Sequence, residues 1–151
     1  MFDVIVIGGG HAGVEAAHAV FRQGLNCCLV TFKTRTIGQM SCNPAIGGLG
    51  KSHLVREVDA LGGIMAKATD RSGIQSRTLN TRKGFAVQAL RVQCDREKYK
   101  NAIQELLLET NITIKEGEVV DIIINDNNIK GIELRSGEKN PSAASEWHSD
   151  A

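Results

Sequence analysis

An apolar segment that runs straight into a glycine loop near the start of the chain constrains its fold more than any other feature. Residues 4–7 read Val-Ile-Val-Ile, and Gly8, Gly10 and Gly13 follow with the spacing G-x-G-x-x-G. In this fingerprint the first glycine allows a sharp turn, the second lets a pyrophosphate approach the backbone, and the third lets the helix pack closely on the strand. The N–H groups at the start of the helix then face the phosphates. The motif predicts a dinucleotide site; a chance glycine turn is the alternative.

The segments that flank this loop predict a βαβ unit. Residues 4–7 form the first strand, and the helix after the loop has apolar residues at helical spacing along one face. Gly24 occupies the position of a left-handed helix cap. Residues 27–31 are apolar except for the last, which is typical of a buried parallel strand.

The middle of the chain is less regular. Residues 32–50 are expected to form a loop rich in Gly, Thr and Ser, and a short helix is expected from Ser52 to the glycines at 62 and 63. Residues 64–94 mix polar, basic and small side chains without a clear period. We expect an excursion with short strands there.

The last third of the chain has a clearer pattern. Apolar residues at 99, 103, 106 and 107 indicate an amphipathic helix. Three strands are predicted after it, at residues 112–114, 118–124 and 129–134. The polar residues 125–128 join the last two strands as a hairpin.

Length and composition are those of a globular domain. The chain has 151 residues, of which 42% are apolar and 23% are charged. No apolar run approaches the roughly 18 residues that cross a membrane, and the first residues lack the basic region that opens a signal peptide. We therefore expect a cytoplasmic protein. Residues 1–139 are expected to form one domain, followed by a poorly ordered tail at 140–151, which has no apolar period.

The four cysteines do not form a recognisable metal or disulfide pattern. Cys27, Cys28, Cys42 and Cys94 show neither C-x-x-C spacing nor an array with histidines. We therefore expect no metal site, no disulfide framework and reduced thiols.

Positive charge is concentrated in residues 71–100. This segment holds eight basic side chains and only two acidic ones, Asp95 and Glu97. Such a block is commonly a solvated face. It can also bind a polyanion such as RNA or a ligand that carries phosphate.

A second glycine-rich segment, residues 38–50, surrounds Cys42. Closely spaced glycines let backbone amides approach a planar ring or a phosphate. Cys42 lies just ahead of a predicted helix start, and a helix N-terminus favours the nucleophilic thiolate. The residues alone leave two interpretations open: a reactive thiol and a buried, inert loop cysteine.

Three segments closely resemble the MnmG (GidA) family of FAD-dependent enzymes that modify the wobble uridine of tRNA. These are residues 8–17 (GGGHAGVEAA), 38–48 (GQMSCNPAIGG) and 57–63 (EVDALGG). The resemblance runs through residues 1–139. It implies an α/β fold: a Rossmann-like FAD-binding βαβ fold with a β-meander, incomplete at the C-terminus.

The resemblance also implies roles for individual residues. Cys42 matches a cysteine linked to catalysis; a thiol there could add to the uridine ring or form an adduct beside the flavin. Val119 matches a position that contacts FAD through its backbone near the adenine. The remaining matches belong to the loop that holds the FAD pyrophosphate: Gly8, Gly9, Gly10, His11, Ala12 and Gly13.

The family's reaction installs a carboxymethylaminomethyl or aminomethyl group on C5 of the wobble uridine. It uses a carbon from methylene-tetrahydrofolate together with FAD and NADH. The family's enzymes are homodimers that work with the GTPase MnmE. These cofactors and partners are expectations that follow from the resemblance alone.

The chain departs from the family pattern at three places. The second strand ends in Thr31 without the usual acidic residue, so we expect Thr31 to bond the adenosine ribose. Phe85 and Gln88 stand where the family usually has proline and arginine. After Lys139 the family sequence does not continue, so we expect the NAD-binding insert, the second catalytic cysteine and the region for tRNA and MnmE to be missing, and catalysis by this chain alone to be incomplete.

Two other functions remain open at this point. One is a flavin-dependent disulfide or quinone oxidoreductase, although such enzymes pair two cysteines beside the flavin and this chain has only Cys42 there. The other is a nucleotide- or RNA-binding module without catalysis that uses residues 71–100.

Overall fold

A parallel three-stranded sheet organises the part of the chain that contains the glycine loop. The structure is a computed structural model in which residues 1–142 are described. It divides into two units, one formed by residues 1–35 with the chain from 110 onward and the other by residues 36–109. Each unit is considered by itself below.

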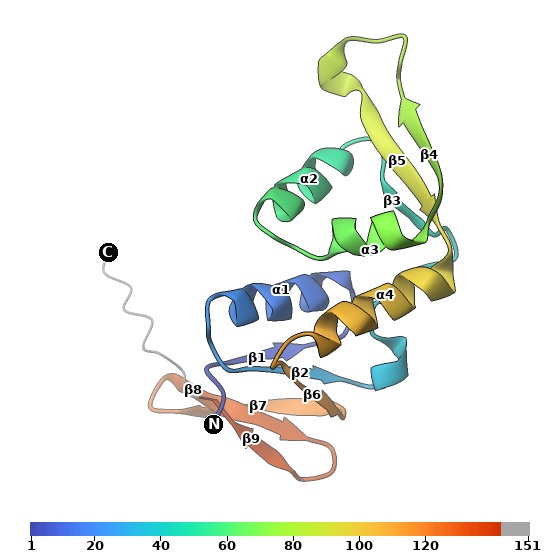
Figure 1. Cartoon of the computed structure of the whole chain (residues 1–151). Coiled ribbons are helices and arrows are strands. Elements are labelled where there is room, and N and C mark those ends of the chain that lie inside the picture. Colours follow the sequence, from blue (N-terminus) through green and yellow to red (C-terminus); the bar gives the residue numbers. More distant parts are fainter. Residues whose placement is uncertain (143–151) are drawn as a thin grey trace, which may run out of the picture. The chain divides into compact units, whose positions relative to one another are not determined.

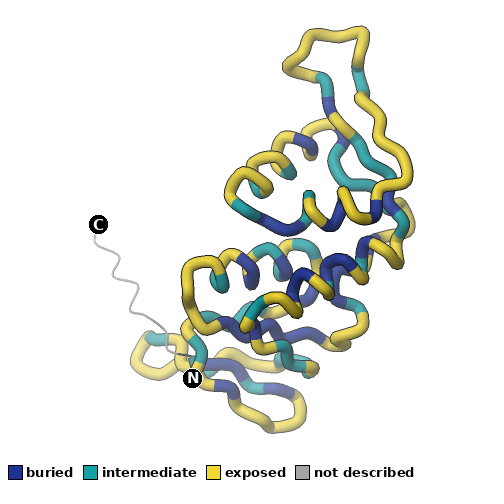
Figure 2. The backbone as a smooth tube through the Cα atoms, in the orientation of Figure 1, coloured by how far each residue is buried: buried dark blue, intermediate teal, exposed yellow. Residues whose placement is uncertain are grey.

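The sheet of the first unit has the order β1-β2-β6, with all strands parallel (Figure 1). It consists of β1 (Val4–Ile7), β2 (Cys27–Thr31) and β6 (Thr113–Glu116). The helix α1 (His11–Arg22) connects β1 to β2 and packs against both strands. Every residue of β2 is buried because this strand is central, whereas β1 at the edge is partly exposed (Figure 2). The predicted βαβ unit is confirmed.

An antiparallel meander completes the first unit. It has the order β7-β8-β9, with β7 (Val119–Asn125), β8 (Asn128–Leu134) and β9 (Lys139–Pro141). Asp126 and Asn127 have positive φ values of 48° and 63°, as a tight hairpin turn of the I′ type requires. The α/β fold with a parallel βαβ sheet and a β-meander is therefore confirmed.

One apolar cluster joins the parallel sheet to the meander. Cys28 and Val30 of β2 pack with Ile132 and Leu134 of β8. The partly buried apolar residues Phe2, Ile5 and Val119 pack against this cluster. Ile132 and Leu134 are two residues apart in β8, so both side chains lie on the same face of the strand.

The strand β9 contradicts part of the prediction for the end of the chain. We expected residues 140–151 to lack regular structure, but Asn140 lies within β9, pairs with Ile132 and is only 2% exposed. The side-chain oxygen Oδ1 of Asn140 accepts a hydrogen bond from Lys115 Nζ. The strand β9 is held by backbone pairing and by the one buried polar side chain of Asn140. Its sequence therefore lacks the alternating apolar residues from which a strand is predicted. Residues 143–151 of the predicted tail lie outside the described residues.

The second unit has an antiparallel sheet with the order β3-β5-β4. Its strands are β3 (Ala45–Gly47), β4 (Gly73–Leu79) and β5 (Ala89–Cys94). The helices are α2 (Ser52–Ala60), α3 (Met65–Ser72) and α4 (Arg96–Leu108). Two short 3₁₀ turns, Thr34–Thr36 and Phe85–Val87, complete the described elements.

The sequence predicts the helix α4 of this unit but not the helix α3. The helix α4 is confirmed: the Asp95 side chain caps it by accepting from Lys98 N (2.9 Å), and Tyr99, Ile103 and Leu107 are buried. The helix α3 was missed because its buried face consists of small residues, among them Thr69 and Ser72. Their hydroxyls are satisfied by carbonyl oxygens of the preceding turn (both 2.7 Å).

Candidate functional site

The glycine loop joins β1 to α1 with the backbone conformation that its glycines require. Gly8 has φ +109°, in the region that favours glycine, and its N–H donates to the carbonyl of Val30 (2.7 Å). Gly9 is buried, and Gly10 is the N-cap of α1. The chain therefore leaves β1 and enters the helix within three residues.

Gly13 is required by close packing. A Cβ at this position would overlap with the carbonyl oxygen of Gly8 and would also approach the side chain of Val6. The third glycine of the fingerprint thus lets α1 begin directly against the end of β1. This is the role that the sequence analysis assigned to it.

Gly10 is different, because the described chain itself does not require a glycine there. Its φ of −76° and ψ of −178° are open to any residue. A Cβ at Gly10 would have no neighbouring atom of the described residues within 4 Å. The missing side chain leaves open space in front of the first turn of α1.

The first turn of α1 has a favourable field for an anion. Helix geometry leaves amides such as those of Ala12 and Gly13 without acceptors inside the helix. Within the described residues, no side chain caps this helix and its first turn has no acidic residue. The positive end of the helix dipole therefore faces the open space beside Gly10.

His11 lies in the same turn and is partly buried. Burial lowers the pKa of His11 below its ordinary value of 6.5, and the carboxylate of Glu15 opposes part of this change. The imidazole is therefore neutral at pH 7. It does not add a full positive charge to the loop.

A carboxylate that the sequence analysis missed lies beside Thr31. Thr31 ends β2, is buried, and pairs in parallel register with Glu116 at the end of β6. The carboxylate of Glu116 accepts from the N–H (2.9 Å) and the hydroxyl (3.1 Å) of Thr34. These bonds, with a smaller contribution from Lys33, hold the pKa of Glu116 below its usual range. The acidic group absent from the end of β2 is thus present on the neighbouring strand.

Val119 opens β7, where it pairs with Leu134 and packs on the apolar cluster of the first unit. Its neighbour Glu118 forms a two-point ion pair with Arg135 (2.6 and 2.7 Å). This ion pair lowers the pKa of Glu118. The pairing with Leu134 and the packing on the apolar cluster place Val119 at the start of β7.

Cys42 lies in the second unit and is the one exposed thiol of the four cysteines, all of which are described. Burial raises the pKa of Cys27 to about 11, and burial also raises the pKa values of Cys28 and Cys94. The expected position of Cys42 directly ahead of a helix is wrong, because β3 intervenes before α2. The field of that helix is therefore not an argument for its reactivity.

A hollow of about 410 Å³ adjoins the Cys42 segment. Both neighbours of the cysteine, Ser41 and Asn43, line it, together with Lys51 and Arg91. Asn43 Oδ1 accepts from the guanidinium of Arg91 (2.9 Å). No acidic residue is among the described residues that line this hollow.

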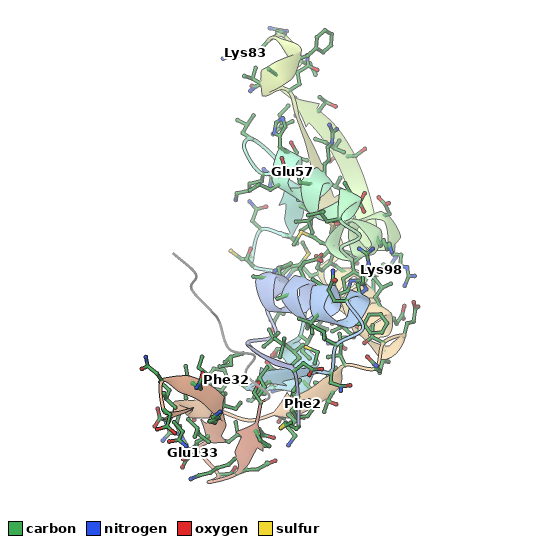
Figure 3. The ribbon with its side chains drawn as sticks, turned by 90° about the vertical axis from the view of Figure 1, so that its left-hand side faces the viewer. Phe2, Phe32, Glu57, Lys83, Lys98 and Glu133 are labelled. Carbon is green, nitrogen blue, oxygen red and sulfur yellow. The ribbon has the colours of Figure 1, made fainter. Side chains whose placement is uncertain are left out.

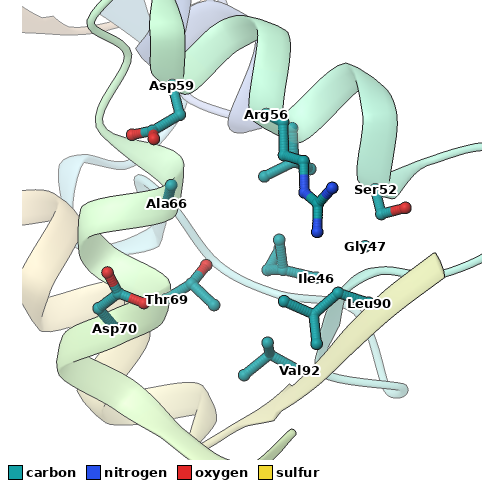
Figure 4. A pocket seen from close by; sticks show the side chains of 11 residues that line it. Ile46, Gly47, Ser52, Arg56, Asp59, Ala66, Thr69, Asp70, Leu90 and Val92 are labelled. Atoms are coloured by element: carbon teal, nitrogen blue, oxygen red, sulfur yellow. The ribbon is translucent and has the colours of Figure 1, made fainter. Parts of the chain in front are cut away.

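A separate, more apolar hollow of about 190 Å³ lies where α2 and α3 meet the other face of the β3-β5-β4 sheet (Figure 4). Ile46, Leu90 and Val92 form its apolar side, and Arg56, Asp59 and Asp70 line it as well. It contains none of the site residues expected from the sequence.

The basic segment 71–100 does not form a single charged face. Arg71 pairs with Glu105 (3.8 Å), Lys100 pairs with Glu97 (2.6 Å), and Arg96 donates to the carbonyl of Met40 (3.3 Å). Lys83 lies at the tip of the β4–β5 hairpin (Figure 3). Phe85, 91% exposed, begins the 3₁₀ turn that connects the same two strands. The positive charges are therefore divided among several elements.

No helix within residues 1–142 is long and apolar enough to cross a membrane. The same residues contain no group of three or more His, Cys, Asp or Glu side chains placed to hold a metal ion.

Comparisons with known proteins agree with this geometry. A sequence model of the family described as Glucose inhibited division protein A matches residues 3–144. The chain is 50% identical to GidA of Aquifex aeolicus in its form II crystal, with a TM-score of 0.90, and covers 24% of that protein with 93% of its own length.

More distant structures share the fold alone. The GidA-related protein of Thermus thermophilus is 12% identical, with a TM-score of 0.60. The match includes 93% of this chain and 49% of that protein. A probable FAD-dependent monooxygenase of Pseudomonas aeruginosa is 17% identical, with a TM-score of 0.62. The match includes 93% of this chain and 40% of that protein. The chain thus spans about a quarter of the length of the A. aeolicus protein.

Proposed function

The chain belongs to the Glucose inhibited division protein A (GidA, or MnmG) family, and we propose that it is the FAD-binding part of a flavoprotein that modifies the wobble uridine of tRNA. One observation carries the proposal most directly. Gly10 is not required by the packing or the backbone conformation of the described chain, and its open position faces the N-terminus of α1. A ligand phosphate that approaches the backbone explains why no side chain is present there.

The residues of the glycine loop fit the pyrophosphate of FAD. Residues 8–13 supply amide donors and an open approach, and the neutral imidazole of His11 leaves charge stabilisation to the amides and the helix dipole. When bound, FAD would supply the hydride-transfer chemistry. The protein's contribution is to hold and orient the cofactor.

The adenosine half of FAD is assigned to the carboxyl ends of β2 and β6. A ribose hydroxyl needs an acceptor there, and Glu116 supplies a carboxylate where the second strand has only Thr31. Thr34 donates two hydrogen bonds to the carboxylate of Glu116. An ionised carboxylate can accept about four, so Glu116 can also accept from a ribose hydroxyl. The backbone of Val119 is assigned to the adenine.

Cys42 is proposed as the nucleophile. Its thiol is exposed and its neighbours Ser41 and Asn43 line a hollow large enough for a nucleoside. A thiolate that adds to the uridine ring would raise the reactivity of C5, and an adduct beside the flavin is the second possibility. Either step needs Cys42 itself, so both are lost in Cys42→Ser.

The complete reaction is proposed for the longer proteins of which this chain matches about a quarter. NADH, methylene-tetrahydrofolate, tRNA, the GTPase MnmE and a homodimeric assembly belong to that whole-protein proposal, together with a cytoplasmic location. For residues 1–142 the proposal is limited to FAD binding and to the thiol of Cys42.

A chimera tests this function. Residues 3–142 of this chain replace the matching segment of A. aeolicus GidA, and modified wobble uridine is measured by mass spectrometry of tRNA nucleosides. We expect modification by the chimera and its loss in the chimera with Cys42→Ser. A chimera that folds and binds FAD but leaves the uridine unmodified would contradict the proposal.

A further inference from the structure

We infer that Arg91 and Arg96 are positioning residues for the thiol of Cys42, because their side chains hold residues on either side of it. The inference rests on the proposed role of Cys42 as the nucleophile. Residues 41–43 are all exposed, whereas Met40, directly before them, is buried. An exposed segment has few packing contacts that could fix its conformation. The position of the thiol therefore depends on the bonds at the two ends of this segment.

The chain before the thiol is held by the start of α4. Arg96, the first residue of this helix, donates from a guanidinium nitrogen to the carbonyl oxygen of Met40 (3.3 Å). A charged donor makes a stronger hydrogen bond to a carbonyl than a neutral one does. The buried face of α4 includes Tyr99 and Ile103, so the helix is a firm support for the carbonyl of Met40.

Packing further along α4 fixes the direction from which the chain approaches Met40. Gln104 donates to the carbonyl oxygen of the buried Ile37 (3.2 Å). Gly38 has φ +71° and lies so close to α4 that a Cβ there would be 2.7 Å from a methyl carbon of Ile103. The loop before Cys42 is therefore fitted to the surface of this helix.

The residues after the thiol are held by the end of β5. Arg91 donates from a guanidinium nitrogen to the side-chain oxygen Oδ1 of Asn43 (2.9 Å). The N–H of Cys94 donates to the carbonyl oxygen of Pro44 (2.8 Å). Within the exposed segment itself, the hydroxyl of Ser41 makes a long bond to the carbonyl of Asn43 (3.5 Å). The supports on both sides thus come from the one stretch in which β5 leads into α4 (Figure 1).

Neither arginine has a charged partner among the described residues. No ion pair within residues 1–142 includes Arg91 or Arg96, whereas Arg71 of the same unit pairs with Glu105 (3.8 Å). A guanidinium presents its donors in a rigid planar fork, so it fixes the direction of a bond as well as its length. Addition of a thiol to a ring carbon needs the reacting atoms about 3–3.5 Å apart. Two directed bonds beside an otherwise exposed segment meet that requirement.

Electron paramagnetic resonance of a nitroxide attached to Cys42 through a disulfide bond measures the mobility of the segment in the 151-residue chain. The other three cysteines are buried, so the exposed thiol takes the label. We expect a sharper, more mobile spectrum in Arg91→Gln and Arg96→Gln than in the wild-type chain, and an intermediate one in Arg96→Lys. Arg71→Gln is the matched control, because it removes an arginine that pairs with α4 and leaves residues 40–43 untouched. A spectrum that is unchanged when both Arg91 and Arg96 are replaced by Gln would overturn the inference.

Turnover in the chimera with A. aeolicus GidA separates positioning from substrate binding and from stability. We expect Arg91→Gln and Arg96→Gln each to lower kcat about tenfold or more, as misplacement of a reacting group predicts, and to change KM for tRNA less than about twofold. The melting temperature and the bound FAD should match those of the Arg71→Gln control. Arg96→Lys should restore part of kcat.

The dependence on Cys42 distinguishes failure of this inference from failure of the proposed function. A chimera that is inactive, or that does not need Cys42, contradicts the proposed function and overturns this inference with it. A chimera that needs Cys42 but keeps its kcat in both arginine variants overturns the inference alone. A raised KM with unchanged kcat would also overturn it, because the arginine would then be a substrate contact. Loss of kcat together with melting temperature and bound FAD would do the same, because the role would then be structural only.

Discussion

Gly13 lies so close to Gly8 that a Cβ at residue 13 would overlap with the carbonyl oxygen of residue 8. Both atoms involved are backbone or directly attached to it, so no side chain can rotate to relieve the overlap. The start of α1 is therefore fixed against the end of β1. This contact determines where the amides of the first helical turn can meet a ligand.

Gly13→Ala should destabilise the chain by about 1–3 kcal/mol, the usual cost of inserting a methyl group into a packed contact. It should also weaken FAD binding, because α1 must move away from β1. Urea unfolding and FAD titration measure the two effects. Wild-type stability in Gly13→Ala would contradict the packing described for α1.

Gly10→Ala should change the stability of the chain little and its affinity for FAD strongly. The added methyl group meets open space in the described chain, so we expect less than about 1 kcal/mol of destabilisation. A methyl group at the approach of the pyrophosphate should nevertheless reduce FAD affinity strongly. FAD affinity that is unchanged in a folded Gly10→Ala variant would exclude phosphate binding at this position.

His11 should make stability depend on pH in a defined direction. Burial lowers its pKa in the folded chain below 6.5, so the unfolded chain takes up the proton first. The full stability is present above about pH 6.5 and declines as the pH falls toward the lower folded-state pKa. His11→Asn should reduce this decline below about pH 6.5. Urea unfolding at several pH values checks it, with the exposed His53→Asn as control; identical curves for the wild type and His11→Asn would contradict the prediction.

A thiol titration of the folded chain should show one fast-reacting group. Cys42 is exposed, whereas burial raises the pKa values of Cys27, Cys28 and Cys94 and lowers their thiolate fractions. Cys42→Ser should remove the fast phase, and Cys94→Ala should keep it. A fast phase that persists in Cys42→Ser would show that another cysteine is accessible.

Asn140→Ala should destabilise the first unit by about 1 kcal/mol, because it removes a buried acceptor for Lys115. Lys139→Ala changes the preceding residue of β9, whose ion pair with Glu133 is long (3.8 Å) and exposed. Its effect should stay below about 0.5 kcal/mol. Equal effects of the two substitutions on urea unfolding would contradict the structural role assigned to Asn140.

The sequence predicts those parts of the fold whose local pattern and packing agree. Residues 4–7 and 27–31 are apolar because both become strands of a buried sheet, and the glycine spacing reflects backbone contacts such as that between Gly13 and Gly8. The helix α3 escaped prediction because Thr69 and Ser72 are buried through hydrogen bonds within their own helix.

Pairings between distant segments were invisible for a different reason. Glu116 lies beside Thr31 only because β6 adds to β2 in parallel register, and nothing local to either residue specifies that neighbour. The same holds for Arg77 and Arg91, whose separate positions in a basic segment do not reveal that they face one another. The sequence therefore located the glycine loop and Cys42 but not the groups that surround them.

The absorbance spectrum of the purified chain after incubation with FAD and removal of unbound flavin tests the central claim most directly. We predict flavin absorbance that remains with the protein for FAD, no retention of FMN, which lacks the adenosine half, and loss of FAD in Gly10→Ala. A folded wild-type chain that emerges without flavin absorbance, or that retains FAD equally well in Gly10→Ala, would contradict FAD binding by the glycine loop.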